Sequence, residues 1–149
     1  MRILIMNGPN LNLLGRREPD IYGRTTMEQC MDDLRARYPQ AQLLYYQSNH
    51  EGDLVDKLQE AGFGQSDQTA GAPTVDGVVL NAGAYTHTSV ALADCIRAIS
   101  VPVVEVHLSN IFAREDYRHH SLLSPVCSGM VCGFGIDVYR LAVEALLCR

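Results

Sequence analysis

The sequence predicts an α/β fold built on a parallel β-sheet, and three observations carry this prediction. Short apolar runs alternate along the chain with segments whose apolar residues recur at helical spacing. Three of the apolar runs are nearly continuous, as in strands that are buried on both faces of a parallel sheet. The 149 residues suffice for one domain with a proper core and are too few for two ordinary ones, so we expect a single domain over residues 1–149.

Five runs are expected to form the strands: Arg2–Met6, Gln42–Gln47, Val78–Leu80, Val103–Val106 and Met130–Cys132. The alternation of strands and helices implies right-handed crossovers, which place helices on both faces of the sheet. Five strands in a chain of this length favour a flavodoxin-like three-layer sandwich with the strand order 2-1-3-4-5.

Capping residues mark the first two predicted helices. The capping-box pattern Thr25–Glu28 opens a helix that we expect to run to about Tyr38. Asn49 is expected to cap a second helix over Glu51–Ala61, which Gly62 would end.

Two further helices follow later in the chain. Thr88 or Ser89 can cap a helix that continues through Ala98, and Ile136–Leu147 has apolar positions at helical spacing. Between the second helix and the third strand, Gln65–Asp76 is rich in Gly, Pro, Thr and Asp, which is typical of a mobile surface loop.

Composition narrows the possible partners and the compartment. Hydrophobic residues make up 47% and charged residues 19% of the chain, as in a soluble globular protein, and a net charge of −5 argues against binding nucleic acid. No apolar run approaches the ~18 residues of a membrane span, and the chain begins with a strand-like segment in place of a signal peptide. Five cysteines without a C-x-x-C spacing favour reduced thiols, so we expect a cytoplasmic protein that binds no membrane.

Polar residues gather after three of the predicted strands. Because ligands bind beyond the carboxyl ends of strands in open α/β sheets, these segments are expected to form an active site. They contribute Asn7, Asn10, Arg17 and Tyr22 after the first strand, Asn81–Ser89 after the third, and His107–Asn110, Arg114 and Arg118 after the fourth. Asparagines, arginines and a tyrosine on one loop suit the binding of a small polar anion and can place a phenol beside a guanidinium.

Several other kinds of site do not fit these residues. The histidines His87, His107, His119 and His120 lack the spacing and the accompanying ligands of a metal site. Gly133-Phe134-Gly135 lacks the third glycine of a dinucleotide-binding loop, and no G-x-S-x-G elbow supports a hydrolase.

The motifs at these strand ends resemble those of type II 3-dehydroquinate dehydratases. The resemblance covers nearly the whole chain in order and is carried by Gly8–Asn12, Arg17–Gly23, Leu80–Ser89, Glu105–Asn110 and Arg114–Arg118. The chain departs from the family at Gly64–Asp76, which is longer than expected there. This difference concerns a surface loop and not the residues of the expected chemistry.

The resemblance implies reversible dehydration of 3-dehydroquinate to 3-dehydroshikimate, in the shikimate pathway or in quinate breakdown. The reaction would be an anti elimination through an enolate, with Tyr22 as the tyrosinate base. The ordinary pKa of a tyrosine, about 10, must fall for this role, and Arg17 on the same loop is the expected cause. No cofactor is implied, because the substrate ketone already acidifies the proton. Lys57, the one lysine, lies on a predicted helix remote from the strand ends, so Schiff-base catalysis is not expected.

The family's acid corresponds to His107, and Glu105 lies two residues earlier on the same side of the strand, where it would orient the ring. Asn10 is expected to stabilise the enolate, with or without an ordered water. The resemblance assigns the substrate carboxylate and hydroxyls to Asn81, His87, Leu108, Ser109 and Arg118. It gives Arg114 either a part in closing the loop or a simple ion pair.

The resemblance also implies an assembly of trimers, typically a homododecamer of four trimers, in which Asp94 reaches the site of a neighbouring subunit. Two other interpretations remain open. The chain could be a flavodoxin-like binding module without catalysis, or a paralogue that acts on another hydroxy-keto acid.

Overall fold

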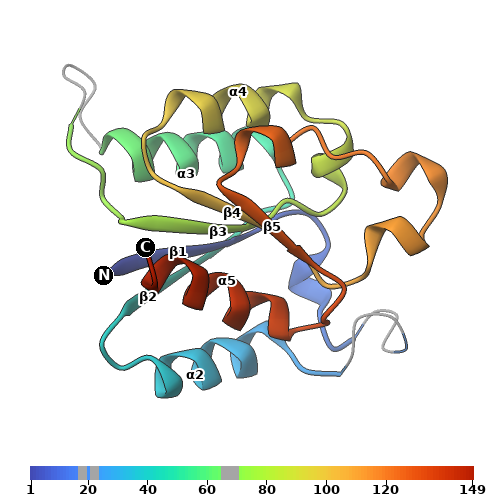
Figure 1. Cartoon of the computed structure of the whole chain (residues 1–149), viewed down its shortest axis with the longest axis horizontal. Coiled ribbons are helices and arrows are strands. Elements are labelled where there is room, and N and C mark those ends of the chain that lie inside the picture. The colour runs from blue at the N-terminus through green and yellow to red at the C-terminus, as the bar shows by residue number, and fades with distance from the viewer. Residues whose placement is uncertain (17–19, 21–23, 65–70) are drawn as a thin grey trace.

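A computed structural model of the chain describes residues 1–16, 20, 24–64 and 71–149, and its described part contains a five-stranded parallel β-sheet (Figure 1). The strands are β1 (Arg2–Asn7), β2 (Gln42–Gln47), β3 (Gly77–Asn81), β4 (Val103–His107) and β5 (Gly129–Cys132). Their order is β2-β1-β3-β4-β5, and every neighbouring pair is parallel. The predicted fold class and strand order are therefore confirmed.

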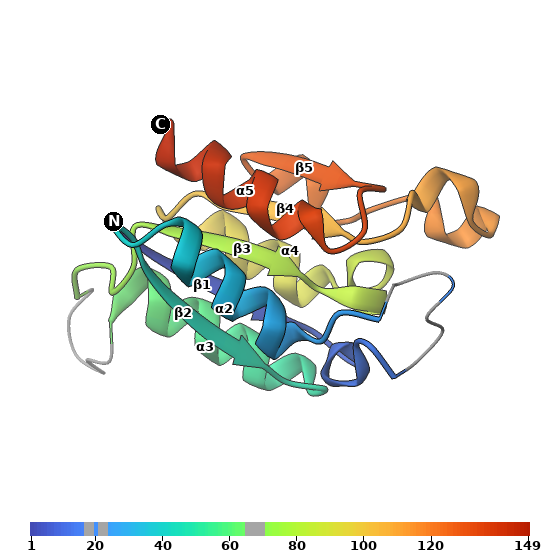
Figure 2. The same cartoon turned by 90° about the horizontal axis from the view of Figure 1, so that it is seen from below.

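Four α-helices cover the two faces of the sheet in the described part of the chain. They are α2 (Met27–Arg37), α3 (Glu51–Phe63), α4 (Val90–Ala98) and α5 (Asp137–Leu147). Helices α3 and α4 lie on one face and α2 and α5 on the other, and the view from below gives the same arrangement (Figures 1 and 2). No helix in the described ranges is both long and apolar enough to cross a membrane.

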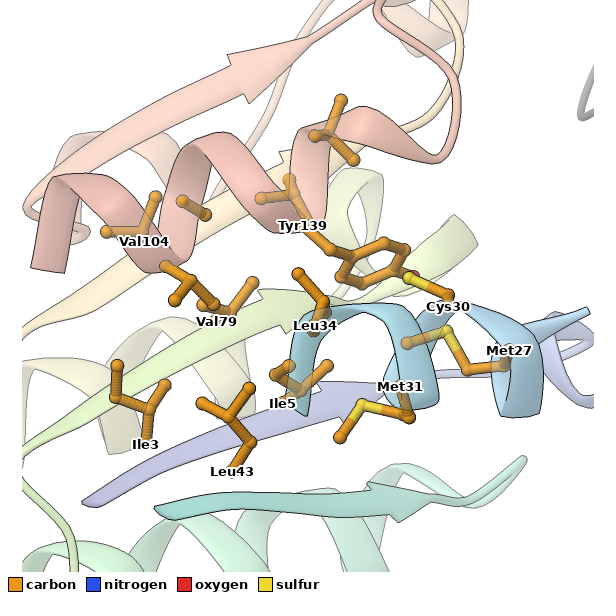
Figure 3. Close-up of a cluster of buried hydrophobic side chains, with 14 of the residues drawn as sticks. Ile3, Ile5, Met27, Cys30, Met31, Leu34, Leu43, Val79, Val104 and Tyr139 are labelled. Carbon is orange, nitrogen blue, oxygen red and sulfur yellow. The ribbon is translucent and has the colours of Figure 1, made fainter. Parts of the chain in front are cut away.

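The apolar runs of the central strands supply two cores, one on each face. In β1, Ile3 and Ile5 face α2 and α5, whereas Leu4 and Met6 face α3 and α4. Successive side chains of a strand point to opposite faces, so a strand between two helical layers must be apolar at every position. Figure 3 shows the first core, where side chains from β1 and β3 meet those from α2 and α5, among them Tyr139.

The capping box of α2 lies one residue later than the sequence indicated. Thr26 accepts the backbone N–H of Gln29 at 3.2 Å, and the Gln29 side chain accepts the N–H of Thr26 at 3.0 Å. The prediction paired Thr25 with Glu28, but the same threonine-rich stretch offers both registers. Helix α2 ends at Arg37, within one residue of the predicted end at Tyr38.

Helix α3 begins at Glu51 as predicted, but its N-cap residue and its C-terminal end differ from the prediction. His50 and not Asn49 is the N-cap residue, because Asn49 is used in a loop contact described below. The helix passes through Gly62 and ends at Phe63, and its C-cap residue Gly64 has a φ of 76°, in the left-handed region that favours glycine. Gly62 is needed for packing, since a Cβ at this position would lie 2.3 Å from Cγ2 of Ile99.

The other two helices begin and end close to their predicted positions. Of the two candidate caps for α4, Ser89 is the one used, and its Oγ accepts the N–H of Leu92 at 2.9 Å. Helix α5 starts at Asp137, one residue after the predicted start. Within the predicted loop Gln65–Asp76, residues 65–70 lie outside the described residues, and Asp76 returns the chain to β1 by donating its N–H to the carbonyl of Arg2 at 2.7 Å.

Candidate active site

A pocket of about 150 Å³ lies at the carboxyl ends of β1, β3 and β4. Figures 1 and 2 show that the loop after β1 and the segment after β4 reach this same end of the sheet. The pocket is lined by Pro9, Asn10, Leu11, Leu13, Leu14, Asn81, Gly83, Ala84, His87, His107, Leu108, Ser109, Ile111, Arg114 and Arg118. The structure thus brings together Asn10, Asn81, His87, His107, Leu108, Ser109, Arg114 and Arg118, which were all expected at the site.

Glu105 and His107 form a buried pair on β4. They are two residues apart, so both side chains leave the same face of the strand. Nε2 of His107 lies 2.7 Å from Oε1 of Glu105, and the carboxylate is completely buried. A carboxylate at this distance fixes the orientation of the imidazole. Such a ring is suited to act as a general acid.

Three hydroxyl groups satisfy the remaining positions around the Glu105 carboxylate. Ser121 donates to Oε1 at 2.8 Å, Thr86 donates to the same oxygen, and Ser124 donates to Oε2. Burial alone raises the pKa of Glu105, but the hydrogen bonds from His107, Ser124 and Thr86 outweigh it and lower the pKa to about 2. Glu105 therefore keeps its negative charge beside the histidine.

The roles of these three hydroxyl groups could not be predicted from the sequence. One available signal was the charge of Glu105 itself, because a carboxylate inside an apolar strand must find donors elsewhere in the chain. That rule predicts that donors exist, but it does not say which serines or threonines supply them.

His87 stands beside His107 with its ring nearly parallel, at a centroid distance of 6.4 Å. Its Nδ1 lies 2.8 Å from the carbonyl oxygen of His120, so Nδ1 carries the hydrogen and Nε2 is left as an acceptor. Burial is the main cause that lowers the pKa of His87, and it outweighs the hydrogen bond to the His120 carbonyl, which raises the pKa. A neutral His87 can accept a hydrogen bond from a substrate hydroxyl.

The loop that carries Asn10 is fastened by Asn49. Asn10 adopts a left-handed conformation with a φ of 67°, and its N–H donates to Oδ1 of Asn49 at 3.0 Å. Gln47 donates to the same Oδ1 at 3.0 Å and to the carbonyl of Gly8 at 3.2 Å. The hydroxyl of Tyr85 donates to the Asn49 carbonyl at 2.8 Å. Asn49 therefore connects the loops after β1, β2 and β3, which explains why it does not cap α3.

Asn81 ends β3 in close contact with the loop after β1. Its carbonyl accepts the N–H of Gly8 at 2.7 Å, and its Oδ1 accepts the N–H of Gly83 at 3.3 Å. A Cβ on Gly8 would lie 2.5 Å from the carbonyl oxygen of Ala82. Only a glycine allows the two loops to approach this closely.

Two arginines bring positive charge to the pocket. Arg118 pairs with Glu115 at 3.0 Å, Arg114 lies 3.4 Å from the same carboxylate, and Arg114 also donates to the hydroxyl of Ser109 at 3.4 Å. Guanidinium groups match the planar geometry of a carboxylate, so this side of the pocket suits an organic acid.

The remaining predicted site residues are Glu105, described above, and Tyr22, Arg17 and Asp94. Tyr22 and Arg17 lie outside the described residues. Asp94 is exposed on α4, where it pairs with Arg97 at 2.7 Å, and it does not line the pocket of its own chain. Among the described residues there is no group of three or more His, Cys, Asp or Glu side chains that could hold a metal ion.

The order of the parallel sheet and the pocket at its strand ends place the chain in the class of flavodoxin-like α/β proteins. The motifs narrow this class to one family. Residues 1–147 match the family model described as dehydroquinase class II, and the chain belongs to this family.

Similar proteins support this assignment over the full length. A relative from Azorhizobium caulinodans named 3-dehydroquinate dehydratase is 56% identical over 146 residues, which cover 97% of this chain and 92% of the relative. One of the same name from an Exiguobacterium strain is 53% identical over 148 residues, covering 99% and 94%. The crystal structure of type II dehydroquinase from Butyrivibrio crossotus gives a TM-score of 0.88 at 42% identity, covering 99% of this chain and 97% of that one.

Proposed function

We propose that this chain catalyses the reversible dehydration of 3-dehydroquinate to 3-dehydroshikimate, as a hydro-lyase. The observation that carries the proposal is the membership of residues 1–147 in the class II dehydroquinases. The pocket at the strand ends is consistent with it, because amides, histidines and arginines converge where a small hydroxylated keto acid would bind.

The reaction needs a base, a place for the developing negative charge, and an acid. We assign the base to Tyr22, with Arg17 stabilising its phenolate, on the strength of the family motif. Removal of the proton next to the ketone gives an enolate, and the Asn10 side chain is our candidate donor to its oxygen. Because the loop of Asn10 is anchored by Asn49, that donor would be held in place before the substrate arrives.

The second half of the reaction expels a hydroxyl group as water. His107 donates the proton to this leaving group, and Glu105 holds the imidazole in position at 2.7 Å. The hydroxyl groups around Glu105 keep it ionised, so a charged carboxylate holds the ring while His107 transfers its proton. Arg118 would bind the substrate carboxylate, while His87, Asn81, Leu108 and Ser109 would bind its hydroxyl groups.

We also propose that the chain works as trimers assembled into a homododecamer, with Asp94 completing the site of a neighbouring subunit. The position of Asp94 on the exposed surface of α4 is compatible with this role, because its carboxylate is accessible to another chain.

We also propose a cytoplasmic location, and the cysteines support it. All five cysteines, each within the described residues, are free thiols. Burial raises the pKa of Cys30 to about 12 and that of Cys95 to about 11, so these thiols remain protonated and unreactive. Unpaired cysteines of this kind are typical of a reducing compartment.

The test is the ultraviolet absorbance of the conjugated enone product after addition of 3-dehydroquinate. We expect the wild-type chain to form the enone and Tyr22→Phe to form it at least 100-fold more slowly, as for loss of a general base. Tyr38→Phe, a one-atom change at a tyrosine that bonds Glu144 and lines no part of the pocket, serves as the control.

Equal rates for wild type and Tyr22→Phe would keep the reaction and reject Tyr22 as the base. A folded wild-type chain that forms no enone would instead indicate a binding module or a paralogue with another hydroxy-keto acid as its substrate.

A further inference from the structure

A tyrosine that the proposed mechanism does not use lies directly beneath the pocket. Tyr139 belongs to α5, and its ring is completely buried in the core between that helix and the sheet (Figure 3). Its hydroxyl leaves the apolar core and contacts two asparagines. It donates to Oδ1 of Asn7 at 2.8 Å and accepts from Nδ2 of Asn81 at 3.1 Å.

The direction of these hydrogen bonds fixes the amide of Asn81. A phenol has one hydrogen, and Asn7 Oδ1 takes it, so the Tyr139 oxygen can only accept from Asn81. Burial raises the pKa of Tyr139, which keeps the phenol neutral and able to serve both partners. On its other side, Oδ1 of Asn81 accepts the N–H of Gly83 at 3.3 Å. Oδ1 and one Nδ2 hydrogen of Asn81 are therefore bonded inside the protein. The second Nδ2 hydrogen is the one that Asn81 can donate to a ligand.

The asparagines are neighbours in the sheet, because Asn7 of β1 is paired in register with Asn81 of β3. Both are buried, and Asn81 also lines the pocket. Without the phenol, the Asn81 amide would lose the partner of its Nδ2 group and keep only the 3.3 Å contact from the Gly83 N–H to its Oδ1. The Tyr139 hydroxyl thus acts together with the Gly83 N–H to hold the Asn81 amide in one orientation.

We infer that Tyr139 is a positioning residue for the substrate: through Asn7 and Asn81 it presents the Asn81 amide as a hydrogen-bond donor to a hydroxyl of the bound hydroxy-keto acid. This inference rests on the proposed function, since it concerns how the same pocket holds its substrate. It gives α5, which contributes no residue to the pocket lining, an indirect part in substrate recognition.

The test compares two one-atom deletions, Tyr139→Phe and Tyr38→Phe. Both tyrosines are buried in the same core, and each uses its hydroxyl in a hydrogen bond, but that of Tyr38 goes to Glu144 and not to a pocket residue. We expect Tyr139→Phe to lower kcat/KM for 3-dehydroquinate about ten-fold, mainly through a higher KM. Tyr38→Phe should leave kcat/KM within two-fold of wild type even if both variants lose stability.

A double-variant cycle separates positioning from general destabilisation. In an Asn81→Ala background, Tyr139→Phe should change kcat/KM less than two-fold, because the amide that it positions is gone. A Tyr139→Phe variant that is folded and keeps wild-type KM overturns the inference, and so does a ten-fold loss that persists in the Asn81→Ala background.

If the wild-type chain forms no enone, the proposed substrate is wrong, and a crystal structure of Tyr139→Phe decides the inference separately. A displaced Asn81 side chain supports the positioning role. An Asn81 amide in its original rotamer with its contact to Gly83 intact overturns it.

Discussion

At the scale of single residues, the central feature is a carboxylate with no exposure to solvent. Glu105 is tolerated inside the sheet because His107 and three hydroxyl groups bond to it, so its charge is compensated at every side. The same groups that make its burial possible also keep it ionised beside the histidine. Stability and acid–base chemistry therefore depend on one cluster.

Ser124→Ala is expected to destabilise the fold in a pH-dependent way. The pKa of Glu105 is lowered from 4.5 to about 2 in the folded chain, so its ionisation contributes stability above pH 4.5. This contribution is lost as the pH falls from about 4.5 toward 2. Removing the Ser124 hydroxyl raises the folded pKa, which should cost about 1–3 kcal/mol at pH 7 and clearly less at pH 2.5.

Urea unfolding of wild type and variant at the two pH values measures this difference. Ser128→Ala, at an exposed serine four residues further along, is the control and should change the free energy of unfolding by less than about 0.5 kcal/mol. An equal loss at both pH values would show that Ser124 acts by packing and not through the charge of Glu105.

The same cluster shows where sequence reasoning stops at this scale. The period of a strand predicts that Glu105 and His107 share a face, and the structure places them in contact. Ser121 and Ser124 come from a loop with short 3-10 turns, where the sequence has no periodicity from which the direction of a side chain could be predicted. Asn49 illustrates the same limit. The sequence indicates a helix cap, but in the structure its side chain accepts the N–H of Asn10 from a distant loop.

At the scale of secondary-structure elements, two glycines of α3 should respond in opposite directions to the same substitution. Gly62→Ala would push a Cβ to within 2.3 Å of Ile99 Cγ2, and we expect a loss of about 1–3 kcal/mol of unfolding free energy. Gly52 has no neighbouring atom within 4 Å, so Gly52→Ala should gain about 0.4–1 kcal/mol from the reduced entropy of the unfolded chain.

Chemical unfolding of the two variants provides the measurement. Each variant is the control for the other, because both make the same substitution in the same helix. Stabilisation by both substitutions would mean that α3 and the Ile99 segment move apart at little cost. The sequence alone could not separate these glycines, since it treated Gly62 as the residue that ends the helix. The contact with Ile99 joins residues 37 positions apart and leaves no local signal.

At the scale of the whole molecule, the alternation of strands and helices was sufficient to predict the sheet and the edge at which the pocket forms. The rule works because a parallel sheet aligns all carboxyl ends, so the residues that follow β1, β3 and β4 must meet there. Tyr22 and Arg17 lie outside the described residues, and their roles remain proposals supported by the family motif. The periodicity of the sequence predicts packing within one chain, and it does not predict how copies of the chain associate.

The proposed assembly gives Asp94 a function that its surroundings in one chain do not. Asp94 and Asp32 are both exposed carboxylates paired with an arginine three residues later on a helix, at 2.7 and 3.7 Å. Such surface pairs contribute little to stability, about 0–1 kcal/mol, so neither substitution should unfold the protein.

If Asp94 completes the site of a neighbouring subunit, Asp94→Asn should lower kcat/KM about ten-fold, whereas Asp32→Asn should leave it unchanged. Light scattering on the same samples reports the mass of the assembly. A fully active monomer, or an Asp94→Asn variant that matches wild type in both mass and turnover, would contradict the role of Asp94, because a site that works without a partner has no need of a residue from one.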